Sequence, residues 1–312
     1  MADAGGAIRF RGVWATVLLA IKEDGTHDLS VIDDQIAVYA VSGCDGIYVG
    51  GTVSEFHSLS DADFKAVAES TAKAARCHGL PFQIAASHPL APGSLSRVRY
   101  ADALEPDGVQ VTLPDWTPID LATVERFLSG CAEAAGGTPL VLYNPPFAKT
   151  VLNPKQILAL CDQIPALAGV KCGGGDADWY RQMMPVFERL SVFIPGHHYH
   201  SGTMQGAHGS YSNMACLSPT AAVNWCSLKT EDAHDLESRI HCFMNDAIAP
   251  LLKRGLPGFA CDKAMAAAGG WTEISPRLLW PYEGASEAEV EHIARAARRH
   301  IPEFLEEVPS HV

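Results

Sequence analysis

The chain has 312 residues, 47% of them hydrophobic and 19% charged, and carries a formal net charge of −13 at pH 7. This is the composition of an ordinary globular protein, long enough for one large barrel or two small domains. So acidic a chain is a poor partner for nucleic acid or for an anionic membrane surface, and we expect neither. No segment approaches the roughly 20 consecutive apolar residues that a membrane-spanning helix needs.

The cysteines indicate a reducing compartment. There are nine, an odd number, with no C-x-x-C pair, and several, such as Cys44, Cys161 and Cys226, lie within apolar runs. Buried, reduced thiols are typical of cytoplasmic proteins rather than of disulfide-rich secreted ones. The segment from Met1 to Arg11 also lacks the apolar core of a signal peptide. We therefore predict a cytoplasmic protein.

Short apolar runs alternate with longer amphipathic stretches along most of the chain. Eight runs predict strands, at residues 14–19, 46–49, 82–86, 109–113, 140–143, 168–171, 192–194 and 210–212. Helical patterns between them cover residues 61–77, 121–135, 154–163 and 177–190. Ser60 is a suitable N-cap for the first of these helices, and Pro154 suits the first turn of the third. Strands that are continuously apolar indicate a parallel sheet buried on both faces.

The strand–helix units are complete near residue 230, and their number fits a closed (β/α)8 barrel better than an open sheet. Neither of the glycine-rich nucleotide-binding motifs, G-x-G-x-x-G opening the first helix or G-x-x-x-x-G-K, is present. Beyond residue 230 only helical patterns remain, at residues 234–254, 259–268 and 287–307. We predict an α/β protein: a (β/α)8 TIM barrel over residues 1–230 with a C-terminal helical extension over residues 231–312.

Active sites of such barrels lie at the C-terminal ends of the strands, and Lys171 ends one of them. Its predicted strand is buried, whereas the other lysines lie in helices or polar loops. Desolvation disfavours an ammonium ion and frees the amine as a nucleophile, which can condense with a carbonyl to form an iminium. The alternative is a strand-end lysine whose amine simply reaches solvent.

Two further groups lie at predicted strand ends. Tyr143 is followed by Asn144-Pro145-Pro146, and its phenol could relay protons, although a core tyrosine would show the same pattern. The loop after the second strand begins Gly50-Gly51-Thr52-Val53-Ser54. Its glycines permit converging backbone N–H groups, which together with the Thr52 and Ser54 hydroxyls could hold a carboxylate. The alternative is an ordinary connecting loop.

Taken together, these residues resemble the dihydrodipicolinate synthase/N-acetylneuraminate lyase family of class I aldolases. Tyr143-Asn144-x-Pro146 matches its Y-N-x-P motif, Gly169-Val170-Lys171 its G-[IV]-K motif, and Gly51 to Glu55 its G-T-T-G-E loop. The stretch from Gly206 to Ser212 and the C-terminal Pro257…Lys263-Ala264 and Arg277…Pro281 are similar too, so the resemblance covers nearly the whole chain.

The resemblance implies a lyase that forms a Schiff base with pyruvate or another 2-oxo acid and catalyses aldol cleavage or condensation. It implies Lys171, Tyr143 and Thr52 as catalytic residues, and Gly51, Val53 and Ser54 as substrate-binding residues. It implies no cofactor, a small-molecule substrate as partner, and a homo-oligomer, either a dimer or a tetramer built from dimers.

The departures from the family pattern concern the second substrate. Val53 and Ser54 replace a threonine and a glycine of the loop, and Trp116 stands where the synthase has a second proton-relaying tyrosine. The synthase's arginine for the second carboxylate falls near Ala148, with Lys149 beside it. We therefore predict that the chain is not a working dihydrodipicolinate synthase. Trp116 favours an apolar or aromatic group, or the carbon face of a sugar chain, stacked over the imine.

Histidines gather at the predicted barrel mouth. His88 ends the third strand, and His197, His198 and His200 follow the seventh. They could bind a metal, as in metal-dependent barrel hydrolases, but no acidic residue ends a strand beside them and Schiff-base chemistry needs no metal. We predict no metal, and a substrate pocket that includes Trp116, His88, His197 and Tyr211.

Three other functions stay open. A dehydratase or hydratase-aldolase, acting on a 2-keto-3-deoxy acid or an arylidene pyruvate, would use the same imine. A metal-dependent barrel hydrolase would use the histidines, and a non-catalytic ligand-binding barrel would keep the fold alone. Borohydride reduction with pyruvate separates the imine-forming functions from the other two.

Overall fold

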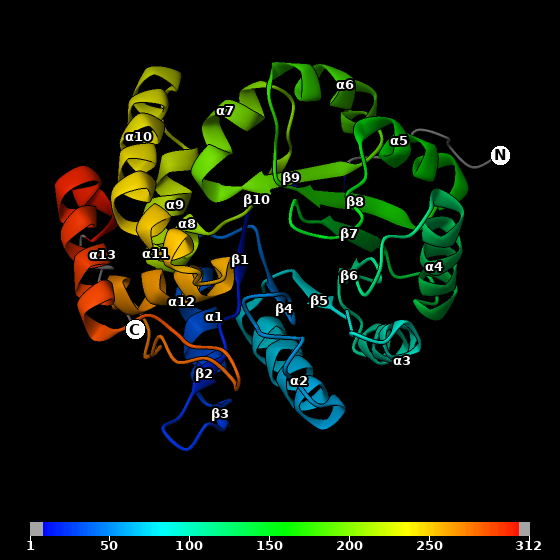
Figure 1. Cartoon of the computed structure of the whole chain (residues 1–312), viewed down its shortest axis with the longest axis horizontal. Helices are drawn as coiled ribbons and strands as arrows, with labels where there is room; N and C mark the ends of the chain where they lie inside the picture. The colour runs from blue at the N-terminus through cyan, green and yellow to red at the C-terminus, as the bar shows by residue number, and fades with distance from the viewer. Residues whose placement is uncertain (1–8, 306–312) are drawn as a thin grey trace.

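Eight parallel strands close into a barrel in the computed structural model, which describes residues 9–305. Around the barrel the strands follow their order in the chain, and helices surround them (Figure 1). The strands are β1 (Gly12–Thr16), β4 (Gly46–Val49), β5 (Phe82–Ala85), β6 (Gly108–Thr112), β7 (Leu140–Asn144), β8 (Leu167–Cys172), β9 (Ser191–Pro195) and β10 (Gly209–Tyr211). The predicted fold class, an α/β (β/α)8 barrel with C-terminal helices, is confirmed.

The first strand differs from its prediction. It ends at Thr16 rather than at residue 19, because the backbone of Leu18 bonds to a helix side chain instead of to a neighbouring strand. The Leu18 N–H donates to Gln35 Oε1, and the Gln35 amide donates back to the Leu18 carbonyl, both at 2.9 Å. The chain then forms an unpredicted antiparallel pair, β2 (Ala20–Ile21) and β3 (His27–Asp28).

The predicted helices are present, with their capping residues. They are α2 (Asp61–His78), α4 (Leu121–Ala134), α5 (Pro154–Gln163) and α6 (Ala177–Phe187). The Ser60 side chain caps α2 by accepting from the Asp63 N–H, and Asn153 and Gln156 form a reciprocal capping box at the start of α5. Helices α1 (Val31–Val41), α3 (Ala91–Asp102), α7 (Tyr199–Met204), α8 (Met214–Leu217) and α9 (Pro219–Cys226) complete the barrel.

The C-terminal region is helical as predicted. It holds α10 (Thr230–Phe243), the π-helical turn η2 (Met244–Ile248), α11 (Ala249–Arg254), α12 (Gly258–Gly269), α13 (Glu287–His300) and the 3₁₀ turn η3 (Pro302–Phe304). Helix α13 ends earlier than predicted because Pro302 cannot continue it. The last two residues predicted for this helix, 306 and 307, lie outside the described residues. These helices gather on one side of the barrel beside α1 and α9 (Figure 1). The division at residue 230 stays a prediction.

Aromatic side chains fill the barrel interior. Trp14, Tyr48, Phe193 and Tyr211 belong to one buried cluster, in which the rings of Tyr48 and Tyr211 meet edge to face with centroids 4.7 Å apart. Because this cluster closes the interior, a ligand has access only from an end of the barrel. A second, larger apolar core lies between the strands and the helices. Within residues 9–305 no helix combines the length and apolarity that crossing a membrane would require.

A fully buried ion pair ties the C-terminal helices to the barrel. Lys263 Nζ on α12 donates to Glu55 Oε1 at 2.7 Å, and both side chains are 0% exposed. The second oxygen of Glu55 accepts from the Leu279 N–H at 2.6 Å. Glu55 has a φ of 54°, a costly conformation for a residue other than glycine. Its two carboxylate contacts hold the loop after β4 in that conformation.

Removing one partner of this pair should be more harmful than removing both charges. Lys263→Met leaves the Glu55 carboxylate buried without a counter-charge, and we expect it to lower the free energy of unfolding by about 3–5 kcal/mol. The double variant Glu55→Gln/Lys263→Met should lose less, because no uncompensated charge stays buried. Urea unfolding of the wild type and both variants measures this. Equal losses in the single and double variants would contradict it.

Candidate active site

Lys171 lies inside the barrel, among three tyrosine rings. Its Nζ is 4.2 Å from the ring centroid of Tyr143 on β7 and 5.2 Å from those of Tyr48 on β4 and Tyr211 on β10. Lys171 and Tyr143 are paired directly in the register of β8 and β7. Because side chains alternate between the two faces of a strand, this pairing directs both groups to the same side of the sheet.

Burial makes the Lys171 amine available as a nucleophile. It lowers the pKa of Lys171 to about 8, against the opposing influence of the Asp262 carboxyl and, less strongly, the Cys216 thiol. At pH 7 about a tenth of such amines are uncharged, compared with less than about one in a thousand for a lysine of ordinary pKa. The loss of hydration therefore outweighs the attraction of the neighbouring negative groups and ring faces.

The neighbouring phenol keeps its proton at neutral pH. Burial, followed by the charge of Asp262, raises the pKa of Tyr143 above its usual range, while a hydrogen-bond contact with Thr52 opposes the shift. Tyr143 can therefore donate a proton to a group that leaves from beside Lys171, and Thr52 lies in position to support it.

Two cavities meet around these residues. The smaller, of about 220 Å³, and the larger, of about 590 Å³, share Tyr143, Lys171, Gly258 and Asp262 in their linings. The smaller cavity is also lined by Thr16, Tyr48, His197, Tyr211, Ser212, Asn213 and Cys216, among others. The larger is also lined by Thr52, Val53, Phe56, His57, Asp115, Phe147, Pro257, Phe259 and Tyr282.

The loop after β4 offers fewer hydrogen-bond donors for a substrate carboxylate than its sequence predicts. Thr52 and Val53 line the larger cavity, and in the part of the chain that the structure describes their N–H groups have no protein acceptor. The Ser54 hydroxyl instead donates to the Val17 carbonyl at 2.7 Å and is buried. Gly51 lines neither cavity; a Cβ there would lie 3.1 Å from the Tyr48 ring. The available anion site thus consists of Thr52 and Val53.

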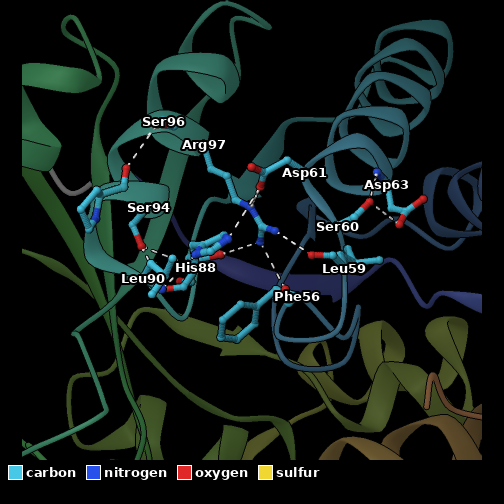
Figure 2. Close-up of polar contacts among 12 residues, drawn as sticks. Phe56, Leu59, Ser60, Asp61, Asp63, His88, Leu90, Ser94, Ser96 and Arg97 are labelled. Carbon is cyan, nitrogen blue, oxygen red and sulfur yellow. Dashed lines mark hydrogen bonds and ion pairs between the residues drawn. The ribbon is translucent and has the colours of Figure 1, made fainter. Parts of the chain in front are cut away.

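A buried arginine holds this loop in place (Figure 2). Arg97 on α3 is 2% exposed and donates to the carbonyls of Phe56 at 3.2 Å, Leu59 at 2.9 Å and Ser87 at 2.9 Å. Its Nε also pairs with Asp61 at 3.1 Å. A guanidinium has several donors in one plane, so a single side chain can fix three carbonyls.

His88 lies outside both cavities. Its Nδ1 accepts from the Leu90 N–H at 2.9 Å, and its Nε2 is 3.8 Å from Asp61, so the ring faces the Arg97 network (Figure 2). The structure does not bring His88 together with Lys171.

Trp116 also lies apart from the cavities. Its side chain is 90% exposed, and Lys149 Nζ lies 5.4 Å from its ring centroid while donating to its carbonyl at 2.7 Å. Its neighbour Asp115 lines the larger cavity. No arginine lies among the described residues that line either cavity, and Ala148 occupies the position where the synthase arginine was expected.

Of the clustered histidines, only His197 reaches the site. It lines the smaller cavity, and its Nδ1 lies 3.2 Å from Asn213 Oδ1. Burial lowers the pKa of His197 to about 4, and the neighbouring His198 adds to the shift, so the ring is uncharged at neutral pH.

A candidate metal-binding set, formed by His198, Glu237 and His241, lies next to His197. The ligand atoms of His198, Glu237 and His241 lie within 4.8 Å of one another, so these residues could hold an ion. Their present contacts already use some of that capacity: Glu237 accepts from Ser201, and His241 Nε2 lies 2.9 Å from the His197 carbonyl. None of the three lines the cavities around Lys171. His200 is not in this set; its ring lies 6.2 Å from that of His234.

Asp262 was missed by the sequence analysis. It lies on α12, lines both cavities, and burial raises its pKa to about 7 while Lys171 opposes the shift. One signal was present: Asp262 and Lys263 are the only charged residues of the otherwise apolar stretch Gly258–Gly269. Tyr48, Thr16 and Cys216, which also line the smaller cavity, were not predicted either.

A family model described as the dihydrodipicolinate synthetase family matches residues 9–299. The chain belongs to this family. An uncharacterized DapA-like lyase of Thermococcus kodakarensis is 24% identical over 174 residues, which cover 56% of this chain and 59% of the relative. The 4-hydroxy-tetrahydrodipicolinate synthase of Acidiphilium cryptum is 26% identical over 162 residues, 52% of this chain and 55% of the relative. The chain thus spans little more than half the length of these curated relatives.

Solved structures match over nearly the whole barrel. YagE, a prophage protein of E. coli K12 in complex with pyruvate, superposes with a TM-score of 0.83 at 19% identity, covering 93% of this chain and 98% of that one. The sialic acid aldolase of Ruminococcus gnavus superposes with a TM-score of 0.80 at 18% identity, covering 95% of this chain and 98% of that one. At these identities the likeness shows the fold.

The lowered pKa of Lys171 can be measured by chemical modification. Only the uncharged amine reacts in reductive methylation, so labelling of Lys171 should rise with pH and reach half its maximum near pH 8. Peptide mass spectrometry across a pH series measures the labelling, with the exposed Lys229 as internal reference. A midpoint near the ordinary lysine value of about 10.4 would contradict the desolvation of this amine.

Proposed function

We propose that the protein is a class I lyase that forms a Schiff base between Lys171 and pyruvate or another 2-oxo acid. The observation that carries this proposal is the desolvated Lys171 amine, enclosed by three tyrosines where two cavities meet. The names of the curated relatives, DapA-like lyase and 4-hydroxy-tetrahydrodipicolinate synthase, support it. So does a structural neighbour that holds pyruvate in the same fold.

The first half of the reaction would form the imine. The neutral Lys171 amine attacks the C2 carbonyl of the 2-oxo acid and gives a carbinolamine. Tyr143 donates a proton to the C2 hydroxyl, which leaves as water, and the nitrogen lone pair forms the C=N bond. The resulting iminium draws electrons from C3, so a C3–C4 bond can break or form. The substrate carboxylate would be bound by the Thr52 hydroxyl and the N–H groups of Thr52 and Val53.

The larger cavity favours an uncharged second substrate. Phe56, Phe147, Phe259 and Tyr282 line it, and among the described residues its lining contains the carboxyls of Asp115 and Asp262 but no arginine. Aromatic walls suit an apolar or aromatic aldehyde, whereas a second carboxylate would be left without a charged partner. The ring of Trp116 is exposed, so it would contact the second substrate only if substrate binding or a second subunit covers this ring.

The cavities around Lys171 also determine how well the other candidate functions are supported. A dehydratase or hydratase-aldolase would use the identical imine, and product analysis with a 2-keto-3-deoxy acid or an arylidene pyruvate separates it from the aldolase. A metal-dependent hydrolase is less well supported, because His198, Glu237 and His241 do not line the cavities. Assembly into a homo-oligomer stays a prediction, as does a cytoplasmic location, which is consistent with nine free cysteines.

Trapping the imine tests the proposal. Incubation with pyruvate and sodium borohydride should attach one reduced pyruvoyl group per chain, and peptide mass spectrometry should find it on Lys171. Lys171→Ala should abolish the adduct, whereas Lys149→Ala, which removes an exposed amine outside the cavities, should leave it unchanged. An adduct on Lys149 or Lys263 would sink the assignment.

Acceptor choice tests the proposed substrate class. With pyruvate as donor, aspartate semialdehyde should be turned over at least about a hundredfold more slowly than an aromatic aldehyde, because the larger cavity offers its carboxylate no cation besides Lys171, which already holds the pyruvoyl group. A coupled reductase assay for the cyclised product and a direct aldol assay measure the two rates. Equal or faster turnover of aspartate semialdehyde would mean that Lys149 or a pocket histidine replaces the arginine.

A further inference from the structure

Asp262 is the only carboxylate among the described residues that line the smaller cavity. It also lines the larger cavity, so its side chain lies where both meet, together with Lys171 and Tyr143. Within residues 9–305 the Asp262 carboxylate makes no hydrogen bond or ion pair with another side chain or with the backbone. Its oxygens are therefore free to accept a proton from a molecule in the cavity.

The next residue along the helix fixes this orientation. Lys263 is anchored by its buried pair with Glu55, and Cys261 on the other side is also buried. Because successive residues on a helix point in directions about a quarter-turn apart, anchoring Lys263 sets the rotation of α12 and directs Asp262 toward the cavities. The Asp262 carboxylate is thus held toward the cavities by the packing of its helix, unlike a freely rotating carboxylate on the surface.

Resting on the proposed imine chemistry, we propose that Asp262 is the catalytic residue that moves the substrate proton in the second half of the reaction. In cleavage, the Asp262 carboxylate takes the proton of the C4 hydroxyl. The O–H electrons form the aldehyde C=O, the C3–C4 bond breaks, and its electron pair makes the C2=C3 enamine while the iminium nitrogen becomes neutral. The Asp262 carboxylic acid then returns the proton to C3, which restores the iminium for hydrolysis.

The other groups in the smaller cavity are poorly suited to this step. Burial raises the pKa of the Tyr143 phenol and of the Cys216 thiol well above neutrality, so neither is ionised to act as a base. His197 is uncharged, but with a pKa of about 4 it binds a proton too weakly to carry it through the reaction. Asp262, whose pKa burial raises to about 7, can both take and return a proton at neutral pH.

The titration of Asp262 depends on several neighbours. Titratable groups face it from β4, β7, β8 and α8, from its own helix, and across both cavities. They are Tyr48, Tyr143, Lys171, Cys216, Cys261 and His197, and, in the larger cavity, His57, Asp115 and Tyr282. Of these, Lys171 is the one that carries a positive charge, and it favours the ionised carboxylate.

Proton exchange at the pyruvate methyl group isolates the proposed step. In D₂O, an enzyme that forms the enamine and protonates it replaces the C3 hydrogens with deuterium, which proton NMR follows directly. Borohydride trapping of the same samples reports imine formation separately. Asp262→Asn keeps the shape of the side chain but removes the base. We expect exchange to fall by at least about a hundredfold while the Lys171 adduct still forms.

The two readouts also separate catalysis from a structural role. Removing the Asp262 charge removes a group that favours the Lys171 ammonium, so trapping at pH 7 should be as fast or faster in Asp262→Asn. A variant with a damaged site would lose both activities. Wild-type exchange should rise with pH through about 7, as the carboxylate ionises, and Asp235→Asn, an exposed control on α10, should behave as the wild type.

Three outcomes would overturn the proposal. Wild-type exchange rates in Asp262→Asn would assign the proton transfer to another group. Loss of the adduct in this variant would place the role of Asp262 in imine formation or in the structure of the site, not in the proton transfers that follow the imine. Absence of a pyruvate adduct in the wild type would remove the imine chemistry on which the proposal rests. Borohydride trapping of the wild type detects this failure separately from a failure of the Asp262 assignment.

Discussion

The Lys171 ammonium loses most of its hydration at the end of β8, and among residues 9–305 only one carboxylate, that of Asp262, lies in the smaller cavity to compensate. The lowered pKa corresponds to about 3 kcal/mol against the charged form. A fully paired lysine would stay protonated and inert as a nucleophile. The neighbouring phenol, thiol and imidazole are all held uncharged by the same burial, so one physical cause sets the protonation state of the entire site.

Two buried cations keep this arrangement rigid from outside the cavities. Arg97 ties the loop after β4 to the end of β5 through three carbonyls, and Lys263 ties the same loop to α12 through Glu55. Thr52 and Asp262 are thereby both held in the lining of the larger cavity, together with Lys171. The C-terminal helices therefore contribute to the site itself, although the eight strands form a closed barrel without them.

The sequence predicts the barrel well because burial on both faces of parallel strands leaves a local signature that periodicity detects. It also predicts that Lys171 and Tyr143 lie at the same mouth of the barrel, because each ends a predicted strand. The sequence does not predict the direction in which a loop side chain points, and this direction determines whether the residue lines the site. His88 points to Asp61, Trp116 points to solvent, and Ser54 bonds to Val17. Asp262 was missed because its place beside Lys171 depends on how α12 packs against the barrel, which no local pattern specifies.

The most direct measurement is a crystal structure of the protein soaked with pyruvate and reduced with borohydride. The account predicts continuous density from Lys171 Nζ to C2 of the ligand, with its carboxylate on the N–H groups of Thr52 and Val53 and the Asp262 carboxylate facing C3. Pyruvate bound in the cavities without a bond to Lys171 would contradict it, as would a reduced adduct on any other lysine.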